Sequence, residues 1–428
     1  MKLPLGSAAR RFREFTVTFR LTRRIGVLTS AAALAVAGVV AAPALYAEEA
    51  PSFYSTPATL PAANGDVIRS EPSIFYLDPI QLIKIDANVN RIMYRTTDRL
   101  GKPIAVTGTV ITPKTAWLGV GERPIVAYAA GTQGLADECA PSRQLSVGSE
   151  YEGPFVSGLI ARGYAVTITD YQGLGTAGDH TYMNRVVQGR AVLDSIRAAQ
   201  RLPAAGVPAN GPVAVHGYSQ GGGAAAAAAE LAPGYAPELK LKGVSAGAVP
   251  ADLFPVARNL DGGLYMAFLG YATVGLTAGY GIDISPLLNA AGQKFMADVR
   301  VPCTLGAIPQ FAFKQSSSLT VDGKSIPSLL DSNTQLRETI AEQRIGKLKP
   351  TVPVLISHSS LDDVIPYGVG KQLALDWCGK GANVRLAPNL GPTHVGGAVA
   401  SYPGAFAWLE ARFAGLPAVS NCWAVPIL

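Results

Sequence analysis

The feature that most restricts what this chain can fold into is Pro212–Ala229, which reads as a strand, a glycine turn and a helix. Val213 and Val215 favour a buried strand, and the alanines at 224–229 favour a helix. Between them, Gly217-Tyr-Ser-Gln-Gly221 matches the pattern G-x-S-x-G, in which a serine occupies a strained strand-to-helix turn. The glycines avoid clashes with neighbouring backbone, and the serine hydroxyl stands clear beside the free N–H groups of the helix. The stretch therefore predicts a nucleophilic serine at position 219.

A second match to the same pattern lies at Gly243–Gly247, around Ser245. This serine follows Leu239-Lys-Leu-Lys242, and Pro250 comes shortly after it. Because proline limits any helix that begins directly after Ser245, the strand–turn–helix context is missing. We therefore assign the nucleophile to Ser219 and interpret Ser245 as the end of the next strand.

Short apolar runs alternate with longer amphipathic runs along much of the chain. This alternation predicts an α/β fold with a mostly parallel, doubly wound sheet and right-handed crossovers. Ligands of such sheets bind beyond the carboxyl ends of the strands, where Ser219 falls. Residues 88–96 and 104–111 predict an antiparallel edge pair. The other predicted elements are strands at 124–128, 165–168, 352–358 and 383–387, and helices at 155–162, 184–202, 334–344, 368–377 and 402–414.

Residues 250–347 interrupt this alternation and are rich in Gly, Ala, Leu, Phe and Tyr. Their length is far beyond that of a normal loop. The segment leaves and re-enters at the strand end that carries Ser219. We interpret it as an inserted helical cap on a core made of residues 48–249 and 348–428; the alternative is additional core helices.

A serine hydroxyl becomes a nucleophile when a base accepts its proton, and a carboxylate must orient that base. The chain has four histidines. His216 lies on the strand before the serine and cannot fold back onto it, His180 precedes the serine in a polar loop, and His358 ends a strand before the acid loop. Enzymes with this turn have the chain order serine, acid, histidine. His394, in an exposed glycine-rich turn at 391–397, is therefore the predicted base.

For the acid, Ser360–Pro366 follows the strand at 352–358 and contains two adjacent carboxylates. Asp362 comes first after the strand and is the predicted partner of the base. Asp363 points to another side and is predicted to cap the following turn. Asp170 also ends a strand, but it precedes Ser219 and is predicted to hold its own loop.

The negative oxygen that develops in such a reaction needs two backbone N–H donors. We expect one from Gln220, directly after the serine. The other is expected from the loop Ala130–Gly134 after the strand at 124–128, where Thr132 and Gln133 are the candidates. The alternative interpretation of that loop is an ordinary glycine turn.

Residues 1–47 have the features of a secretory signal peptide. A positive segment ends at Arg24, an apolar run extends from Ile25 to Ala42, and small residues offer cleavage after Ala44 or Ala47. The alternative, a membrane anchor, is disfavoured because the apolar run is marginal for a span. The general secretory route is preferred to twin-arginine export, since Gly26 replaces the usual large apolar residue after the arginine pair.

The predicted signal peptide also explains the net positive charge of the chain. Residues 1–47 hold seven Lys or Arg and one acidic residue, so their net charge of +6 accounts for the net charge of the whole chain, which is also +6. No basic surface for a nucleic-acid partner therefore remains. No integral membrane span is expected once the leader is removed.

Four cysteines, Cys139, Cys303, Cys378 and Cys422, all follow the leader. An even number in an oxidising compartment predicts two disulfides, for which three pairings are possible. Their spacing is not that of a metal site. No metal or organic cofactor is implied.

The ordered series of motifs resembles the secretory lipase family, which belongs to the α/β-hydrolase superfamily. The resemblance covers nearly all of the chain after the leader. It is carried by Phe53-Tyr54, Tyr94-Arg-Thr-Thr97, Cys139-Ala-Pro-Ser142, Gln188-Gly-Arg-Ala-Val-Leu-Asp194, Gly217-Tyr-Ser219, Tyr235-Ala-Pro-Glu-Leu239, Asp362 through Tyr367, and Cys378-Gly-Lys-Gly-Ala-Asn383.

The resemblance implies an α/β-hydrolase with a triad of Ser219, Asp362 and His394 and oxyanion donors at Gln220 and Gln133. It also implies the disulfides Cys139–Cys303 and Cys378–Cys422. Gln133 stands where an acidic residue is expected, and Gln220 where a glycine is expected. Both still supply a backbone N–H, although the pH response can differ.

The expected function is a secreted hydrolase of carboxylic esters, above all triacylglycerols, that forms an acyl-enzyme on Ser219. Its partner would be a lipid or small-ester substrate at a lipid–water interface. One alternative is another serine acyl enzyme, such as an acyltransferase, a peptidase or a cutinase-like polyesterase; the large insertion disfavours a cutinase. The other is a non-catalytic binding protein on a hydrolase fold, which the complete set of Ser, Asp and His disfavours.

Overall fold

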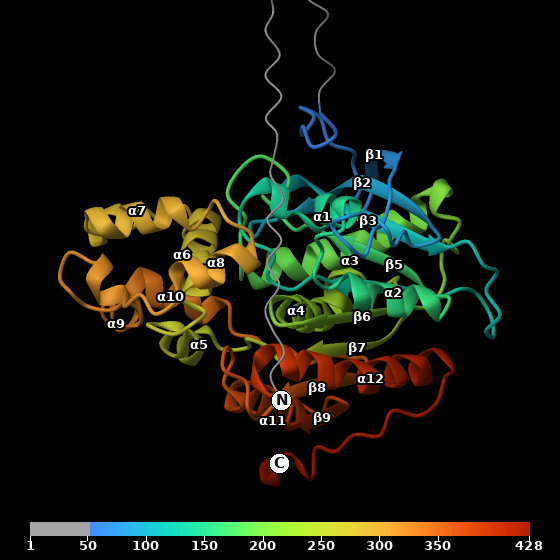
Figure 1. Cartoon of the computed structure of the whole chain (residues 1–428). Coiled ribbons are helices and arrows are strands. Elements are labelled where there is room, and N and C mark those ends of the chain that lie inside the picture. Colours follow the sequence, from blue (N-terminus) through green and yellow to red (C-terminus); the bar gives the residue numbers. More distant parts are fainter. Residues whose placement is uncertain (1–51) are drawn as a thin grey trace, which may run out of the picture. The chain divides into compact units, whose positions relative to one another are not determined.

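Nine strands form one sheet in the computed structural model, which describes residues 52–428 (Figure 1). The spatial order is β1-β2-β3-β5-β4-β6-β7-β8-β9. The strands are β1 (Val67–Pro72), β2 (Ala87–Thr97), β3 (Pro103–Pro113), β4 (Ile125–Ala129), β5 (Ala165–Thr169), β6 (Val213–Tyr218), β7 (Leu241–Gly247), β8 (Val354–Ser359) and β9 (Val384–Asn389).

The sheet is mixed but mostly parallel from β4 onward. The pairs β4–β5, β4–β6, β6–β7, β7–β8 and β8–β9 are parallel, whereas β1–β2, β2–β3 and β3–β5 are antiparallel. The predicted α/β fold is therefore confirmed. The segments predicted as an antiparallel edge pair are β2 and β3, but the edge itself is β1. Its sequence, VIRSEP, lacks the alternation that would have indicated a strand.

Helices flank both faces of this sheet (Figure 1). α3 and α4 pack against each other and the sheet, and α11 joins them where Trp377 donates to Glu230 of α4. α2 and α12 lie together: Phe155 of α2 stacks on Tyr402 of α12, and Arg162, just after α2, forms an ion pair with Glu410. The helices are α1 (Pro141–Val147), α2 (Gly153–Ala161), α3 (Arg185–Arg201), α4 (Gln220–Tyr235), α5 (Leu253–Leu260), α6 (Met266–Tyr280), α7 (Ala290–Asp298), α8 (Thr304–Phe311), α9 (Ile326–Ser332), α10 (Thr334–Glu342), α11 (Tyr367–Gly379) and α12 (Thr393–Phe413).

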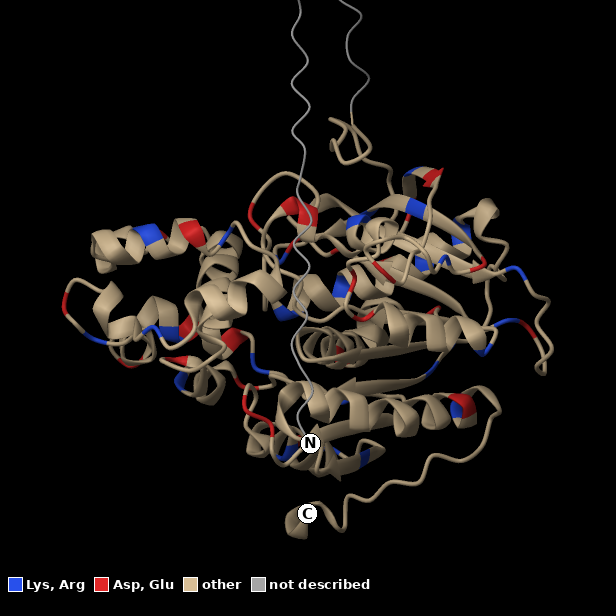
Figure 2. Cartoon of the chain, viewed as in Figure 1, with Lys and Arg blue, Asp and Glu red and all other residues tan. Residues whose placement is uncertain are grey.

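The segment between β7 and β8 is helical and contains α5 to α10. These helices gather beside the sheet core in Figure 1. Lys, Arg, Asp and Glu are interspersed over the described residues (Figure 2), which agrees with the balanced charge after the predicted leader. Within residues 52–428, none of the helices combines the length and the apolar character that a bilayer crossing requires.

The parallel strands place four chain segments at one edge of the sheet. The carboxyl ends of β4, β6, β8 and β9 lead into the loop at 130–134, the turn at Ser219, the loop at Asp362 and the start of α12. Residues that are distant in sequence therefore meet at this edge.

Candidate active site

Ser219 occupies the turn between β6 and α4 that the sequence predicts. Its φ of 61° and ψ of −124° lie where residues other than glycine rarely occur. A Cβ at Gly221 would overlap the carbonyl oxygen of Ala129 on β4, and a Cβ at Gly217 would overlap the carbonyl oxygen of Gly221. The strand and helix thus approach more closely than side chains at these positions would permit.

Backbone hydrogen bonds hold this turn in place. The N–H of Ser219 donates to the carbonyl of Gly247 at the end of β7, over 3.0 Å. The carbonyl of Ser219 accepts from the N–H of Gly223 in the first turn of α4, over 2.9 Å. The side chain of Ser219 lines a large pocket next to the insertion.

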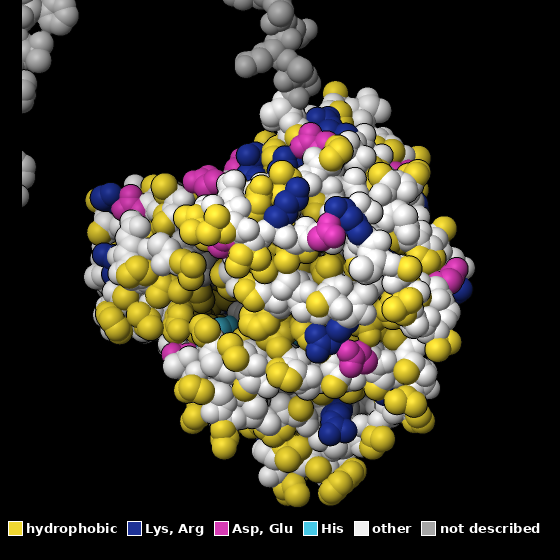
Figure 3. Space-filling model, turned by 45° about the vertical axis from the view of Figure 1, so that its right-hand side comes forward, with side chains coloured by type: hydrophobic (Ala, Val, Ile, Leu, Met, Phe, Trp, Pro, Cys, Tyr) yellow, Lys and Arg dark blue, Asp and Glu magenta, His cyan; other side chains and the backbone are white. Residues whose placement is uncertain are grey.

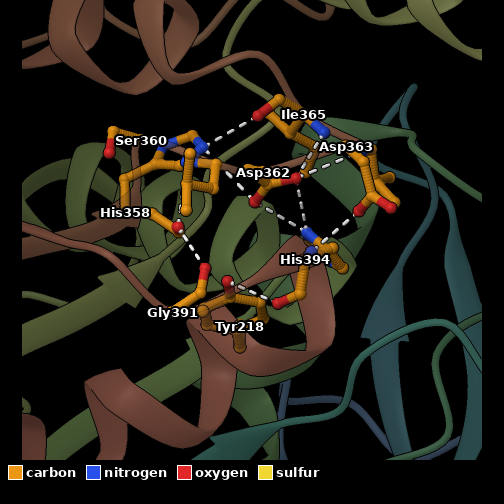
Figure 4. Close-up of polar contacts among 12 residues, drawn as sticks. Tyr218, His358, Ser360, Asp362, Asp363, Ile365, Gly391 and His394 are labelled. Carbon is orange, nitrogen blue, oxygen red and sulfur yellow. Dashed lines mark hydrogen bonds and ion pairs between the residues drawn. The ribbon is translucent and has the colours of Figure 1, made fainter.

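Asp362 and His394 meet from the ends of β8 and β9 (Figure 4). Nδ1 of His394 lies 2.8 Å from Oδ2 and 3.0 Å from Oδ1 of Asp362, whose side chain is fully buried. Because Nδ1 donates to the carboxylate, Nε2 is the nitrogen left to accept a proton. Burial raises the pKa of Asp362, but hydrogen bonds from His358 and His394 outweigh burial and hold that pKa well below its usual range.

His394 lies in the first turn of α12 and not in an exposed turn, so the predicted start of this helix at 402 is wrong. Its side chain is buried, with 7% exposed. Asp363 does not cap the turn after β8 as predicted, because its Oδ1 accepts the backbone N–H of His394 over 2.8 Å. Gly397 lets the helix approach the sheet, since a Cβ there would lie 2.7 Å from the hydroxyl of Tyr218.

Tyr218 connects the serine turn to the histidine. Its hydroxyl donates to the carbonyl of His394 over 2.9 Å, and the two rings are 5.0 Å apart (Figure 4). Since Tyr218 directly precedes Ser219, this contact holds the imidazole next to the turn. Among the hydrogen bonds of residues 52–428 there is none between the Ser219 hydroxyl and His394.

The other three histidines are buried. Burial lowers the pKa of His216 to about 3, and its ring packs against Tyr128 and Tyr402. His358 lies with Nε2 2.9 Å from the carbonyl oxygen of Ile365, to which it donates. Burial lowers the pKa of His180 to about 4, so this ring is neutral at neutral pH.

His180 has a role that the sequence did not indicate. Its Nδ1 lies 2.9 Å from the carbonyl oxygen of Gln172 and therefore carries the proton. Its Nε2 then accepts from the side-chain amide of Gln220, over 3.1 Å. The pair orients the residue that follows Ser219. Nothing in the sequence indicates that His180 and Gln220 are in contact, because the conformation of the loop around His180 brings them together.

The loop at 130–134 lies beside the start of α4, where Gly221 faces Ala130. Thr132 contacts the hydroxyl of Tyr182 through its Oγ1, over 2.6 Å, and is buried. Gln133 is also buried, and its side-chain amide donates to Glu150 over 3.1 Å. Among the hydrogen bonds of residues 52–428, none has the backbone N–H of Thr132 or Gln133 as its donor, so both remain candidate donors to a ligand.

A disulfide joins the helical segment between β7 and β8 to the chain just after this loop. Cys139 pairs with Cys303, and Cys378 pairs with Cys422, so the prediction of two disulfides is confirmed, with the pairing that the family resemblance implies. Cys303 directly precedes α8 and forms a β-bridge with Gly134. The next residue, Thr304, donates its N–H to the carbonyl of Gln133 over 2.9 Å.

Two candidates that the sequence set aside lie elsewhere. Ser245 is fully buried inside β7, and its hydroxyl has no hydrogen-bond partner within residues 52–428. Asp170 accepts from Thr107 on β3 over 2.6 Å and from the N–H of Ser142 on α1 over 2.8 Å. It therefore joins neighbouring elements, whereas the sequence predicts that it holds its own loop.

A pocket lies between Ser219 and the helical segment that joins β7 to β8. Its walls are apolar side chains from α5, α6, α9 and α10, among them Leu253, Val256, Leu269, Leu276, Leu330 and Ile340. Figure 3 shows a hollow lined by hydrophobic side chains with a histidine at its floor. Such a pocket can receive an apolar chain whose polar end remains at the serine turn.

The sheet order, the serine turn on a central strand and the acid and histidine after later strands define an α/β-hydrolase. Residues 140–421 match the model of the family described as secretory lipase. The chain belongs to the secretory lipase family, and its lipase relatives indicate a hydrolase that acts on esters.

Individual relatives agree with this assignment. A protein of Mycobacterium tuberculosis named a probable inactive lipase is 30% identical, covering 85% of this chain and 82% of its own. A secreted triacylglycerol lipase of Malassezia globosa is 29% identical, covering 78% and 74%. The crystal structure of Candida antarctica lipase A in its closed state has a TM-score of 0.77 at 25% identity, covering 87% of this chain and 88% of its own.

Proposed function

We propose that this protein is a secreted triacylglycerol lipase that hydrolyses carboxylic esters through an acyl-enzyme on Ser219. The observation that carries the proposal is the hydrogen bond between Asp362 and His394 beside the serine turn, at an apolar pocket. The name of the Malassezia relative supports triacylglycerols as the substrate class.

In this mechanism the hydroxyl of Ser219 attacks the ester carbonyl while Nε2 of His394 accepts its proton. Asp362 keeps the proton on Nδ1 and stabilises the imidazolium. His394 then protonates the leaving alcohol. Water attacks the acyl-enzyme with His394 again as the base, which releases the fatty acid and restores the serine.

The developing oxyanion would receive hydrogen bonds from the backbone N–H of Gln220 and from that of Gln133 or Thr132. The start of α4 supports the first donor, because the first N–H groups of a helix have no partner within it. The buried loop after β4, held by Glu150 and Thr304, supports the second.

The same proposal assigns residues 250–347 as a cap over a core of residues 48–249 and 348–428, and the pocket between them as the acyl site. The two disulfides and the secretory family support an extracellular location. The predicted signal peptide, residues 1–47, lies outside the described residues.

Replacing Ser219 and Ser245 separately tests the proposal. Ser219→Ala should reduce tributyrin hydrolysis by about 10⁴-fold or more and abolish labelling by a fluorophosphonate, because no nucleophile remains. Ser245→Ala should retain labelling. Label on a folded Ser219→Ala variant would contradict the assignment.

The second candidate is a non-catalytic binding protein. The mycobacterial relative, which is named a probable inactive lipase, favours considering it. Here Ser219, Asp362 and His394 are all present, and two of them are hydrogen-bonded. Rates on tributyrin, triolein and a peptide amide separate the alternatives. A lipase cleaves both glycerides, a peptidase cleaves the amide, and a binding protein cleaves none.

A further inference from the structure

Two buried carboxyl groups lie behind the loop at 130–134. Glu150 and Glu152 precede α2, and only 5% and 4% of these residues are exposed. Within residues 52–428, neither group has an ion pair with Lys or Arg, and no cation lowers the pKa of either. Two negative charges in so dry a place are costly without a cation or a proton to neutralise them.

These carboxyl groups directly contact the loop that holds the candidate oxyanion donors. Oε2 of Glu152 accepts the backbone N–H of Gly131 over 2.7 Å. The side-chain amide nitrogen of Gln133 lies 3.1 Å from Oε1 of Glu150 and 3.4 Å from Oε2 of Glu152. One amide therefore touches both acids, and the conformation of the loop depends on them.

The groups around the pair are neutral or acidic. From β4, the hydroxyl of Tyr128 donates to Oε1 of Glu152 over 3.0 Å, and from α12 the hydroxyl of Tyr402 contacts that of Tyr128. His216 on β6 packs against both tyrosines and is neutral, because burial lowers its pKa to about 3. From the end of β5, the charge of Asp170 adds repulsion.

The pair also has more acceptors than donors. Oε2 of Glu150 and Oε1 of Gln133 are buried with no hydrogen-bond partner within residues 52–428. A proton on a carboxyl group adds a donor and removes a charge at the same time. Burial raises the pKa of Glu150 to about 7, and burial with repulsion from Glu150 raises the pKa of Glu152 to about 8.

We propose that Glu150 and Glu152 are positioning residues that hold the oxyanion loop in their protonated form, and that their ionisation weakens catalysis. The inference rests on the proposed function. Negative charge beside Gln133 opposes the negative oxygen of the transition state and alters the hydrogen bonds at Gly131. The effect belongs to kcat, since the oxyanion is absent in the bound ester.

The double substitution Glu150→Gln and Glu152→Gln tests this. The amides keep an acceptor oxygen and nearly the same shape but cannot ionise. In the natural protein, kcat on tributyrin should fall about tenfold between pH 6 and pH 9, a size below that of losing an oxyanion donor. In the double variant this ratio should shrink to about twofold, while the pH dependence of KM stays the same.

Single substitutions sharpen the test. Glu150→Gln removes the repulsion that raises the pKa of Glu152, so Glu152 should ionise at lower pH and the total loss of kcat should be smaller, because one charge is gone. Glu410→Gln, a half-exposed acid paired with Arg162, is the matched control and should leave the pH ratio as it is. A double variant with the natural pH ratio would overturn the proposal.

Thermal unfolding gives a readout that does not depend on ester hydrolysis. In the folded protein the pKa values of Glu150 and Glu152 are raised above the unfolded value of about 4.3. At any pH between the unfolded and the folded pKa values, the folded state therefore binds more protons than the unfolded state. The associated stability is fully present below the unfolded pKa and is lost as pH rises through about 7 and about 8.

The Tm of the natural protein should therefore fall between pH 6 and pH 9 by several degrees more than that of the double variant. Equal falls in a folded double variant would refute the buried proton even if the protein hydrolyses esters. A protein that hydrolyses no ester but shows the Tm difference would retain the buried proton and lose only the proposed function.

Discussion

At the scale of single residues, the site depends on two glycines that have no side chain next to Ser219. Ser219 keeps an unfavourable backbone conformation because β4, β6 and α4 crowd around it. Gly217 and Gly221 allow this crowding, since any side chain there would overlap backbone atoms that cannot move independently. The serine is therefore held by its neighbours and not by its own conformational preference.

Two glycines of the same helix turn allow a matched comparison. Gly221→Ala should cost about 3 kcal/mol of unfolding free energy or more, because its Cβ would enter the carbonyl of Ala129. Gly223→Ala should cost far less, because its Cβ would meet only the side chain of Pro250, at a tight 3.2 Å, and the helix preference of alanine offsets part of that strain. Urea unfolding and tributyrin assays measure both effects; equal stabilities would show that the turn can relax.

At the scale of elements, helix starts and loop ends carry the chemistry. α12 begins at the predicted base, where Asp363 accepts the N–H of His394. α8 begins beside the loop at 130–134, where Cys303 bridges Gly134 and Thr304 donates to Gln133. The cysteine bridge to the insertion therefore does more than limit the unfolded chain. Both cysteines also pack against Gly134, the residue that follows the second candidate oxyanion donor.

The two disulfides should separate stability from activity. Replacing either pair by serines should cost about 4 to 5 kcal/mol by loop entropy, for sequence separations of 164 and 44 residues. At a temperature where both variants are folded, the Cys139–Cys303 variant should also lose kcat, by about tenfold, because Gly134, which packs against both cysteines next to Gln133, loses this support. Equal kcat values in the two variants would contradict this role.

At the scale of the whole molecule, the pocket is lined by residues of the sheet core and of the helical segment between β7 and β8. Ser219 comes from the sheet, whereas the apolar walls come from α5, α6, α9 and α10. Substitutions in the pocket walls should therefore change the selectivity among acyl chains without changing the reacting groups.

Two alanines of α6 test this division. Ala272 lines the pocket, so Ala272→Phe should lower the rate on triolein relative to tributyrin by about tenfold, a typical consequence of lost apolar binding. Ala278 is exposed on the same helix, and Ala278→Phe should leave the ratio of the two rates unchanged. If both variants changed the ratio alike, the acyl chain would bind elsewhere.

Much of this arrangement could be predicted from the amino-acid sequence. The elbow, the order serine, acid, histidine and the alternating strands depend on local pattern, and these patterns are strong near Ser219. The edge strand β1 and the start of α12 could not be predicted. β1 has no apolar alternation, and α12 begins through a glycine-rich segment stabilised by distant Asp363 and Tyr218.

The sequence by itself determined the fold class, the serine turn and the family, because these follow from periodicity, from glycines at fixed spacing and from ordered motifs. Only the tertiary structure decided that His180 meets Gln220, that Cys303 touches the loop at 130–134 and that Glu150 and Glu152 share a buried site behind it. The physical reason is that burial and long-range contact set the pKa of an acid and the position of a loop, and neither is a property of neighbouring residues in the chain.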